Sequence, residues 1–271
     1  MTTPPIPPEL ILDQQIAFEP PPPPRETPRG MDLLVMGAIL FAAGILTFLG
    51  GAVAMSVWGH YAHIVPKEMS KAQTFAFAIP LQALWYLLAL AIAVPVYRFR
   101  WQRSFAAGVH WNAAVAQSRA WALLGSGLLL SVLVQVASIK IHMPSTAPVY
   151  ELFRFPALAW CVTVFGVFIA PPVEEIFFRG FLLPILARGT GNVVAVVITS
   201  ALFALLHASQ IGHAWMAVVV LGGVSVVLCM VRIRYNSVAA STLVHMAYNG
   251  LLFVMMIAAT GGYRHLDKIP H

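Results

Sequence analysis

Seven long apolar stretches, separated by short polar segments, run through most of this 271-residue chain. A helix needs about 20 apolar residues to cross the hydrocarbon core of a bilayer, and most of the stretches are near or above that length. We therefore expect an all-α, polytopic bundle of about seven to eight transmembrane helices. The expected spans are 33–58, 73–97, 120–139, 157–187, 193–208, 213–231 and 237–260.

The composition agrees with a membrane protein. Hydrophobic residues make up 59% of the chain and charged residues only 10%, whereas soluble domains carry about 25% charged residues. The formal net charge of +6 comes from bases scattered through short loops, which argues against nucleic-acid binding. Cys161 and Cys229 lie within apolar stretches, so we expect packing residues rather than a disulfide or a metal pair.

Three regions differ in composition. Residues 1–30 contain the run Pro20–Pro24 and are expected to be a disordered, extended tail without a cleavable signal peptide. Residues 31–262 form the transmembrane domain, whose catalytic core is expected at about 120–260. Residues 263–271 form a short polar C-terminal tail.

The loop bases predict an orientation. An arginine-rich segment at 98–119 is placed in the cytoplasm, which puts the N-terminus inside and the C-terminus outside a cell (inner or plasma) membrane. Nine bases then lie inside: Arg25, Arg29, Arg98, Arg100, Arg103, Arg119, Arg188, Arg232 and Arg234. Six lie outside: Lys67, Lys71, Lys140, Arg154, Arg264 and Lys268. A re-entrant segment would reverse the side of the C-terminus.

Three short motifs place ionisable or amide side chains inside the later apolar stretches. Ionisable groups are costly in a bilayer and usually mark a functional site. Within each motif the key residues are four apart, which puts them on one helix face. The motifs are Glu174-Glu175-x-x-x-Arg179, Phe203-x-x-x-His207 and His245-x-x-x-Asn249.

The motifs are expected to lie at similar depths. Gly189-Thr190-Gly191-Asn192 is a turn signal between two antiparallel helices. At a rise of about 1.5 Å per residue, Glu174 and His207 both lie roughly 21 Å from that turn, and His245 lies roughly 13–14 Å from the same side. Helix tilt and side-chain reach absorb the difference of about 7 Å. The three motifs are therefore expected to form one site.

Pro171 and Pro172 come directly before the first motif. Neither has an N–H group to donate, so the helix is expected to kink or to restart there. A restart would put Glu174 and Glu175 in the first turn of a new helix, where free N–H groups favour carboxylates.

The residue types allow hydrolysis. A carboxylate in an apolar site suits a general base that takes a proton from an attacking water, and an amide N–H can donate to the developing oxyanion. Arg179 can pair with Glu175, and Phe203 is expected to pack against the site. Glu174, His207 and His245 also match the ligand types of catalytic zinc, so the residues leave metal-dependent and metal-free hydrolysis open. A serine nucleophile fits poorly, because neither Ser126 nor Ser225 lies in a Gly-x-Ser-x-Gly sequence.

In this order and in membrane helices, the three motifs resemble the CPBP family, which includes the Ras-converting CAAX prenyl endopeptidases and the bacterial Abi proteins. The resemblance covers roughly residues 120–260. It implies an intramembrane endopeptidase of the glutamate type, formerly classed as a metalloprotease, with no cofactor. The substrate would be a membrane-associated protein or peptide, possibly lipidated or membrane-anchored, cut near its C-terminus.

The resemblance also implies a role for each motif residue. Glu174 would activate the attacking water and His207 would help to hold it. His245 and Asn249 would form the oxyanion side, and Glu175 and Arg179 would support the site. Two other functions remain open from the residues: a non-enzymatic membrane scaffold or bacteriocin-immunity-type protein, and a transporter using the polar pocket. The chain shows no obvious inverted repeat, which weighs against the transporter.

Overall fold

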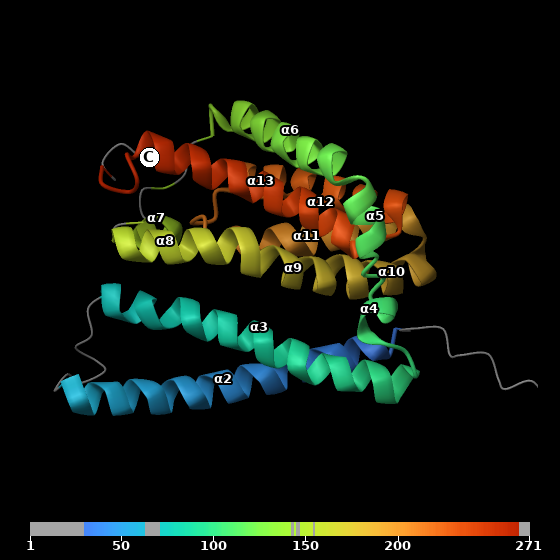
Figure 1. Ribbon diagram of the computed structural model, residues 1–271, viewed down its shortest axis with the longest axis horizontal. Helices are drawn as coiled ribbons and strands as arrows, with labels where there is room; N and C mark the ends of the chain where they lie inside the picture. The colour runs from blue at the N-terminus through green and yellow to red at the C-terminus, as the bar shows by residue number, and fades with distance from the viewer. Residues whose placement is uncertain (1–29, 63–70, 142–143, 145–146, 154, 266–271) are drawn as a thin grey trace, which may run out of the picture.

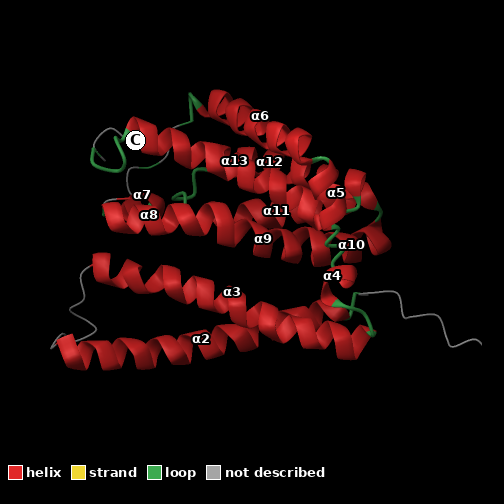
Figure 2. Ribbon diagram, viewed as in Figure 1, coloured by secondary structure: helices red, strands yellow, loops and turns green. Residues whose placement is uncertain are grey.

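A computed structural model describes residues 30–62, 71–141, 144, 147–153 and 155–265. Figure 2 shows helices and loops in this part of the chain and no strand. The expected all-α architecture is therefore confirmed. The proline-rich tail at 1–29 and the last six residues lie outside the described residues.

The first two long helices form an antiparallel pair, α2 (Asp32–Ala62) and α3 (Lys71–Trp101), along one side of the molecule (Figure 1). In the middle of the pair, the Trp85 indole N–H donates to the carbonyl oxygen of Leu40 over 3.0 Å. At the end of α3, the Trp101 indole N–H donates to Asp32 over 3.3 Å, and the Arg100 guanidinium lies 3.7 Å from the same carboxylate. Polar contacts thus fix the start of α2 against the end of α3.

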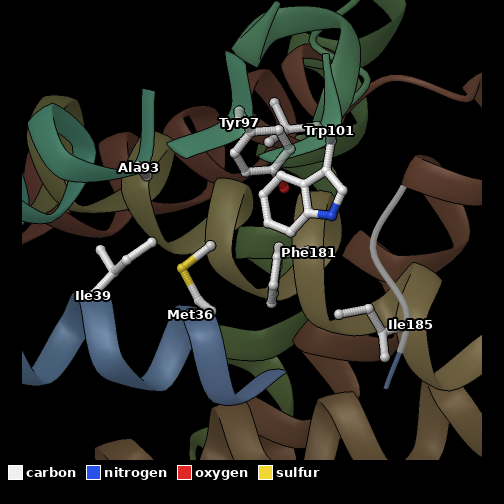
Figure 3. Close-up of a cluster of buried hydrophobic side chains, with 8 residues drawn as sticks. Met36, Ile39, Ala93, Tyr97, Trp101, Phe181 and Ile185 are labelled. Atoms are coloured by element: carbon white, nitrogen blue, oxygen red, sulfur yellow. The ribbon is translucent and has the colours of Figure 1, made fainter. Parts of the chain in front are cut away.

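An apolar cluster attaches this pair to the rest of the bundle (Figure 3). Side chains from α2 and α3 point toward Phe181 and Ile185, which belong to the helix that carries the first motif. The Tyr97 and Trp101 rings lie 4.5 Å apart, centroid to centroid, and the Phe181 ring lies 6.4 Å from each. The buried members are Met36, Ile39, Ala93, Tyr97, Trp101, Val109, Phe181 and Ile185.

The arginine-rich segment folds into two short helices, α4 (Phe105–Gly108) and α5 (Ala113–Ser118). Their N-caps are Ser104 and Asn112, whose side chains accept backbone hydrogen bonds from the third residue after each cap. Capping residues of this kind satisfy N–H groups that a helix start leaves free. The segment leads directly into α6 (Ala120–Ser138).

The fourth expected span is one long helical run over Pro156–Thr190. It contains two π-helical stretches. In these, each backbone carbonyl accepts a hydrogen bond from the N–H of the residue five positions later, and not four positions later as in an α-helix. The helix therefore continues past Pro171 and Pro172, so of the two expected outcomes, a kink or a restart, the restart with a free N-terminus before Glu174 does not occur. The run consists of α8 (Pro156–Val164), η2 (Phe165–Ile169), α9 (Ala170–Glu175), η3 (Ile176–Leu182) and α10 (Leu183–Thr190).

Three further helices complete the bundle: α11 (Asn192–Ala208), α12 (Trp215–Tyr235) and α13 (Val238–Ala259). The expected turn before α11 is a single residue, Gly191, whose φ of 79° falls in the region that favours glycine. Helix α13 packs closely on α6 at Gly127. The two helices are so close there that a Cβ on Gly127 would collide with the Val244 carbonyl oxygen. A short helix, α7 (Pro148–Phe153), lies beside the start of α8.

Six helices within the described residues are long and apolar enough to cross a membrane. The remaining expected span, 193–208, corresponds to α11, which is apolar but has 17 residues, the lower end of the length that spans a bilayer. Large apolar side chains such as Phe41, Phe48 and Leu206 face outward. Apolar atoms on the outside agree with a lipid environment, so the chain is an integral membrane protein. The predicted orientation stays a prediction.

Two details differ from the sequence-based assignment. Tyr263 was assigned to the polar C-terminal tail, but it is buried and its hydroxyl lies 2.7 Å from the Thr163 hydroxyl. The folded domain therefore extends past residue 262. Both cysteines are free, as expected, and Cys229 is buried, whereas Cys161 is exposed and so is not a core residue.

Candidate active site

A buried ion pair forms the centre of the site. Arg179 Nη1 donates to Glu175 Oε1 over 2.7 Å, and both side chains are 0% exposed. From α12, the Ser225 hydroxyl and carbonyl oxygens accept from Arg179 Nη2 over 2.6 and 3.1 Å. The guanidinium also lies 4.8 Å from the centre of the Phe203 ring. Because a buried charge is tolerated only when it is paired and hydrogen-bonded, these contacts explain how Arg179 can lie inside the bundle.

His245 of α13 connects the two glutamates. Its Nδ1 lies 3.0 Å from Glu175 Oε1, and its Nε2 lies 3.9 Å from Glu174 Oε2. A carboxylate oxygen accepts hydrogen bonds, so Nδ1 carries a hydrogen and Nε2 is the nitrogen that faces Glu174. Glu175 therefore sets both the direction and the tautomer of the imidazole, as an orienting carboxylate does in a catalytic triad.

The two neighbouring carboxylates lie in different surroundings. Glu175 is enclosed, whereas Glu174 is 16% exposed and makes no hydrogen bond within the described part of the chain. Tyr86 of α3 lies close enough to Glu174 for an electrostatic interaction. Successive residues on a helix point about 100° apart, which gives adjacent glutamates separate roles. Glu174 is the carboxylate that remains accessible.

His207 joins the site through Phe203. Its ring centroid lies 4.8 Å from that of Phe203, and the Phe203 centroid lies 5.9 Å from that of His245. His207 Nδ1 donates to the Phe203 carbonyl oxygen over 2.8 Å, so its Nε2 has a free lone pair. Phe203 thus packs among the charged and ring groups, as expected from the sequence.

Asn249 lies one helical turn beyond His245 and contacts the π-helical stretch η2. Its Nδ2 donates to the Gly166 carbonyl oxygen over 2.7 Å. The Ala170 N–H donates to Phe165 O in the π-helical pattern, and the next donor in that pattern would be Pro171, which has no N–H. Asn249 therefore satisfies a carbonyl that the proline leaves unpaired. One of its two amide hydrogens is used in this way, and the other is available.

Replacing Asn249 with alanine is expected to destabilise the protein by about 1–3 kcal/mol, because the Gly166 carbonyl loses its donor. The cost should be smaller when Pro171 is also replaced with alanine, which supplies the missing N–H. Thermal unfolding of the two single variants and the double variant in detergent measures this coupling. Asn192→Ala, at the exposed start of α11, is the control. Equal costs in both backgrounds would contradict the pairing.

Ser225 and Arg232 also contact Arg179, although they are not among the site residues predicted from the sequence. Arg232 was counted among the loop bases, but it is buried, and its Nε donates to the carbonyl oxygen of Arg179 over 3.1 Å. Its Nη1 donates to Asn236 Oδ1 over 2.9 Å. Helix α12 therefore holds Arg179 at two places, by its guanidinium and by its backbone. The spacing Ser225–Arg232, two helical turns, is the only sequence signal for a shared face.

Direct contacts join Glu174, Glu175, Arg179 and His245, and His207 is linked to them through the Phe203 ring. Asn249 lies one helical turn from His245, and its described side-chain contact is with Gly166. If the site were metal-dependent, the ligands predicted from the sequence would be Glu174, His207 and His245. Among the described residues, no group of three or more His, Cys, Asp or Glu side chains is arranged to hold a metal ion.

A comparison with known protein families finds a match over the same part of the chain. Residues 156–251 match the family model described as type II CAAX prenyl endopeptidase Rce1-like. The match begins with α8 and ends within α13, so it contains all six predicted residues, and it confirms the family resemblance. No curated protein and no solved structure matches the chain.

Proposed function

We propose that this chain is an intramembrane protease of the Rce1-like type II CAAX prenyl endopeptidase family, whose model matches residues 156–251, and that it uses Glu174 as its general base. The observation that supports this most is the difference in surroundings between two adjacent carboxylates. Glu175 Oε1 already accepts from Arg179 and His245, whereas Glu174 is partly accessible beside His245 Nε2. Glu175 is fully buried, so Glu174 is the carboxylate of the two that water can reach.

In the proposed reaction, a water lies between Glu174 and the lone pair of His207 Nε2. Glu174 removes a proton as the water oxygen attacks the scissile carbonyl carbon, and the same proton then passes to the leaving amine. Both new fragments are thereby completed: a carboxyl group on one side and an amine on the other. His207 holds the second hydrogen of the water and fixes the direction of attack.

Negative charge develops on the carbonyl oxygen during the attack. The protonated form of His245 can donate from Nε2, and the carboxylate of Glu175 stabilises that positive imidazolium through Nδ1. The remaining N–H of Asn249 is a second donor. Preorganised donors of this kind contribute about 10²–10³ in rate each. Arg179 keeps Glu175 ionised and in place, and so acts through it.

The proposed substrate is a membrane-associated protein or peptide that is cut near its C-terminus. The test is a comparison of protein termini, by mass spectrometry of membrane fractions, between cells with and without this chain. A defined set of new N- and C-termini that depends on the chain supports proteolysis. Identical termini would favour the scaffold or immunity function.

The proposal includes hydrolysis without a metal ion. Treatment with a strong chelator, followed by metal analysis of the purified protein, is expected to leave cleavage unchanged within about twofold, since Glu174 rather than a metal lowers the barrier for the water. Loss of cleavage on chelation, with recovery when zinc is returned, would instead assign Glu174, His207 and His245 as ligands.

A further inference from the structure

A cleft of about 390 Å³ opens at the arginine-rich end of the bundle, away from the candidate active site. It lies between the junction of α5 with α6 and the end of α12. Two of its five lining residues are arginines, and none is acidic. The lining residues are Val115, Ser118, Arg119, Arg234 and Tyr235.

The two arginines come from different parts of the fold, Arg119 from the junction of α5 with α6 and Arg234 from α12, and both line the same space. The Arg234 guanidinium lies 5.6 Å from the centre of the Tyr235 ring, a cation–π contact at the wall of the cleft. Neither Arg119 nor Arg234 forms an ion pair with a carboxylate anywhere in the described ranges. Their charges are therefore available to an external anion.

The start of α6 adds backbone donors. Arg119 is the N-cap of this 19-residue helix, and its side chain makes no capping hydrogen bond. The first-turn N–H groups of a helix have no acceptor within the helix, and the helix dipole is positive at this end. Guanidinium groups and free N–H groups together are the donors that bind phosphate in proteins.

The cleft lies at the level where a bilayer has its headgroups. A candidate membrane span begins at Ala120, directly after Arg119. Trp121, in the first turn of that span, is 87% exposed. An outward-facing tryptophan at the end of a span is typical of the membrane–water interface, where its ring sits among the headgroups.

The surrounding charge is also positive. The last turns of α3 and α12 and the end of α10 bring further arginines to this end of the molecule. His110, which lies between α4 and α5, has its pKa lowered by burial and then by the nearby charges of Arg232, Arg103 and Arg188. The one described acid at this end, Asp32, already faces Arg100.

We propose that the cleft between Arg119 and Arg234 binds the phosphate of an anionic phospholipid headgroup. The phosphate joins α6 to α12, and α12 carries Ser225 and Arg232, which hold Arg179. A bound lipid would therefore stabilise the helix that positions the ion pair. This inference does not depend on the proteolytic activity.

The test uses the full-length protein purified in detergent. Phosphatidylglycerol is titrated, with phosphatidylcholine of the same acyl chains as the reference, and both the bound lipid (by native mass spectrometry) and the thermal unfolding midpoint are recorded. Phosphatidylglycerol is expected to bind and to raise the midpoint, and phosphatidylcholine is not. Since each basic side chain near an anionic surface contributes about 1 kcal/mol, each arginine is expected to account for about fivefold in affinity.

Two matched double variants decide where the lipid binds. Arg119→Gln with Arg234→Gln is expected to weaken phosphatidylglycerol binding by about 25-fold and to abolish the midpoint shift. The second double variant, Arg98→Gln with Arg103→Gln, removes the same amount of charge from the same end of the molecule but outside the cleft. It is expected to retain both phosphatidylglycerol binding and the midpoint shift. Equal losses in the two double variants would overturn the site in favour of a general positive surface.

A third arm separates the lipid from free phosphate. Inorganic phosphate and glycerol phosphate, added without lipid, are expected to leave the midpoint unchanged at concentrations where phosphatidylglycerol saturates. If inorganic phosphate alone reproduces the shift, and the Arg119/Arg234 variant loses it, the lipid assignment is overturned and the cleft is a phosphate site.

Discussion

Replacing Glu174 with glutamine is expected to abolish cleavage while the protein still accumulates in the membrane. Glutamine has nearly the same shape as glutamate but cannot take a proton from water, and general-base catalysis contributes about 10²–10⁴ in rate. Glu174 makes no hydrogen bond in the described part of the chain and is partly exposed, so the replacement leaves no buried partner unpaired. A fall in cleavage of at least about a hundredfold is the expected result.

The measurement combines three readouts. Mass spectrometry of membrane fractions compares N- and C-termini between the wild type and Glu174→Gln. Immunoblotting reports accumulation, and thermal unfolding of the purified proteins reports folding. Ser126→Ala is the matched control, because Ser126 is a polar residue of another span whose hydroxyl donates to the carbonyl oxygen of Leu123 in its own helix. This control is expected to cleave normally.

Glu175→Gln gives the contrast that makes the test specific. Glu175 Oε1 accepts from Arg179 and from His245, so glutamine there leaves the arginine without its counter-charge. Both accumulation and cleavage are expected to fall. If Glu174→Gln keeps the same set of cuts as the wild type, Glu174 is not the base. If Glu174→Gln lowers accumulation as much as Glu175→Gln does, the separate roles of the two carboxylates are wrong.

The spans could be predicted from the sequence because they depend on one quantity, the length of each apolar run. Expected boundaries such as 120–139 and 237–260 lie within a residue or two of α6 and α13. The meeting of the motifs was also predictable. A constant rise per residue, counted from the turn at Gly191, gives the depth of Glu174 and His207 without any knowledge of packing.

The π-helical stretches could not be predicted in the same way. Two adjacent prolines predict that a helix is disturbed, but the sequence alone does not decide between a break and a wider turn. The outcome depends on whether another helix supplies a donor for the freed carbonyl. Asn249 does so for Gly166, and the two residues are 83 positions apart. Such a contact becomes visible only when α13 is placed beside η2.

Arg232 illustrates a different limit. An arginine near the end of an apolar stretch usually lies at the membrane surface, and the positive-inside rule counts it there. Here the side chain turns inward, because the Arg179 carbonyl oxygen and Asn236 Oδ1 offer it acceptors. Its count as a surface base was therefore wrong. Ser225, considered from the sequence only as a nucleophile, instead accepts hydrogen bonds from Arg179.

Replacing Arg179 with alanine is expected to destabilise the protein by about 3–5 kcal/mol, since it leaves Glu175 as an unpaired buried carboxylate. The Ser225 carbonyl loses its donor at the same time, and the space beside Phe203 is emptied. Accumulation in the membrane and the unfolding midpoint should both fall. Arg98→Ala, at the exposed end of α3, is expected to change neither.

Two further variants separate charge from volume. Arg179→Lys keeps the charge but cannot reach Glu175 and Ser225 in the forked geometry of a guanidinium, so it should recover only part of the midpoint. Glu175→Gln combined with Arg179→Met removes both charges and refills the space, and replacing a buried ion pair by apolar groups is often neutral. This double variant should therefore be more stable than Arg179→Ala but inactive, because His245 loses its orienting carboxylate. If Arg179→Ala accumulates and unfolds as the wild type does, the ion pair does not stabilise the fold and serves catalysis alone.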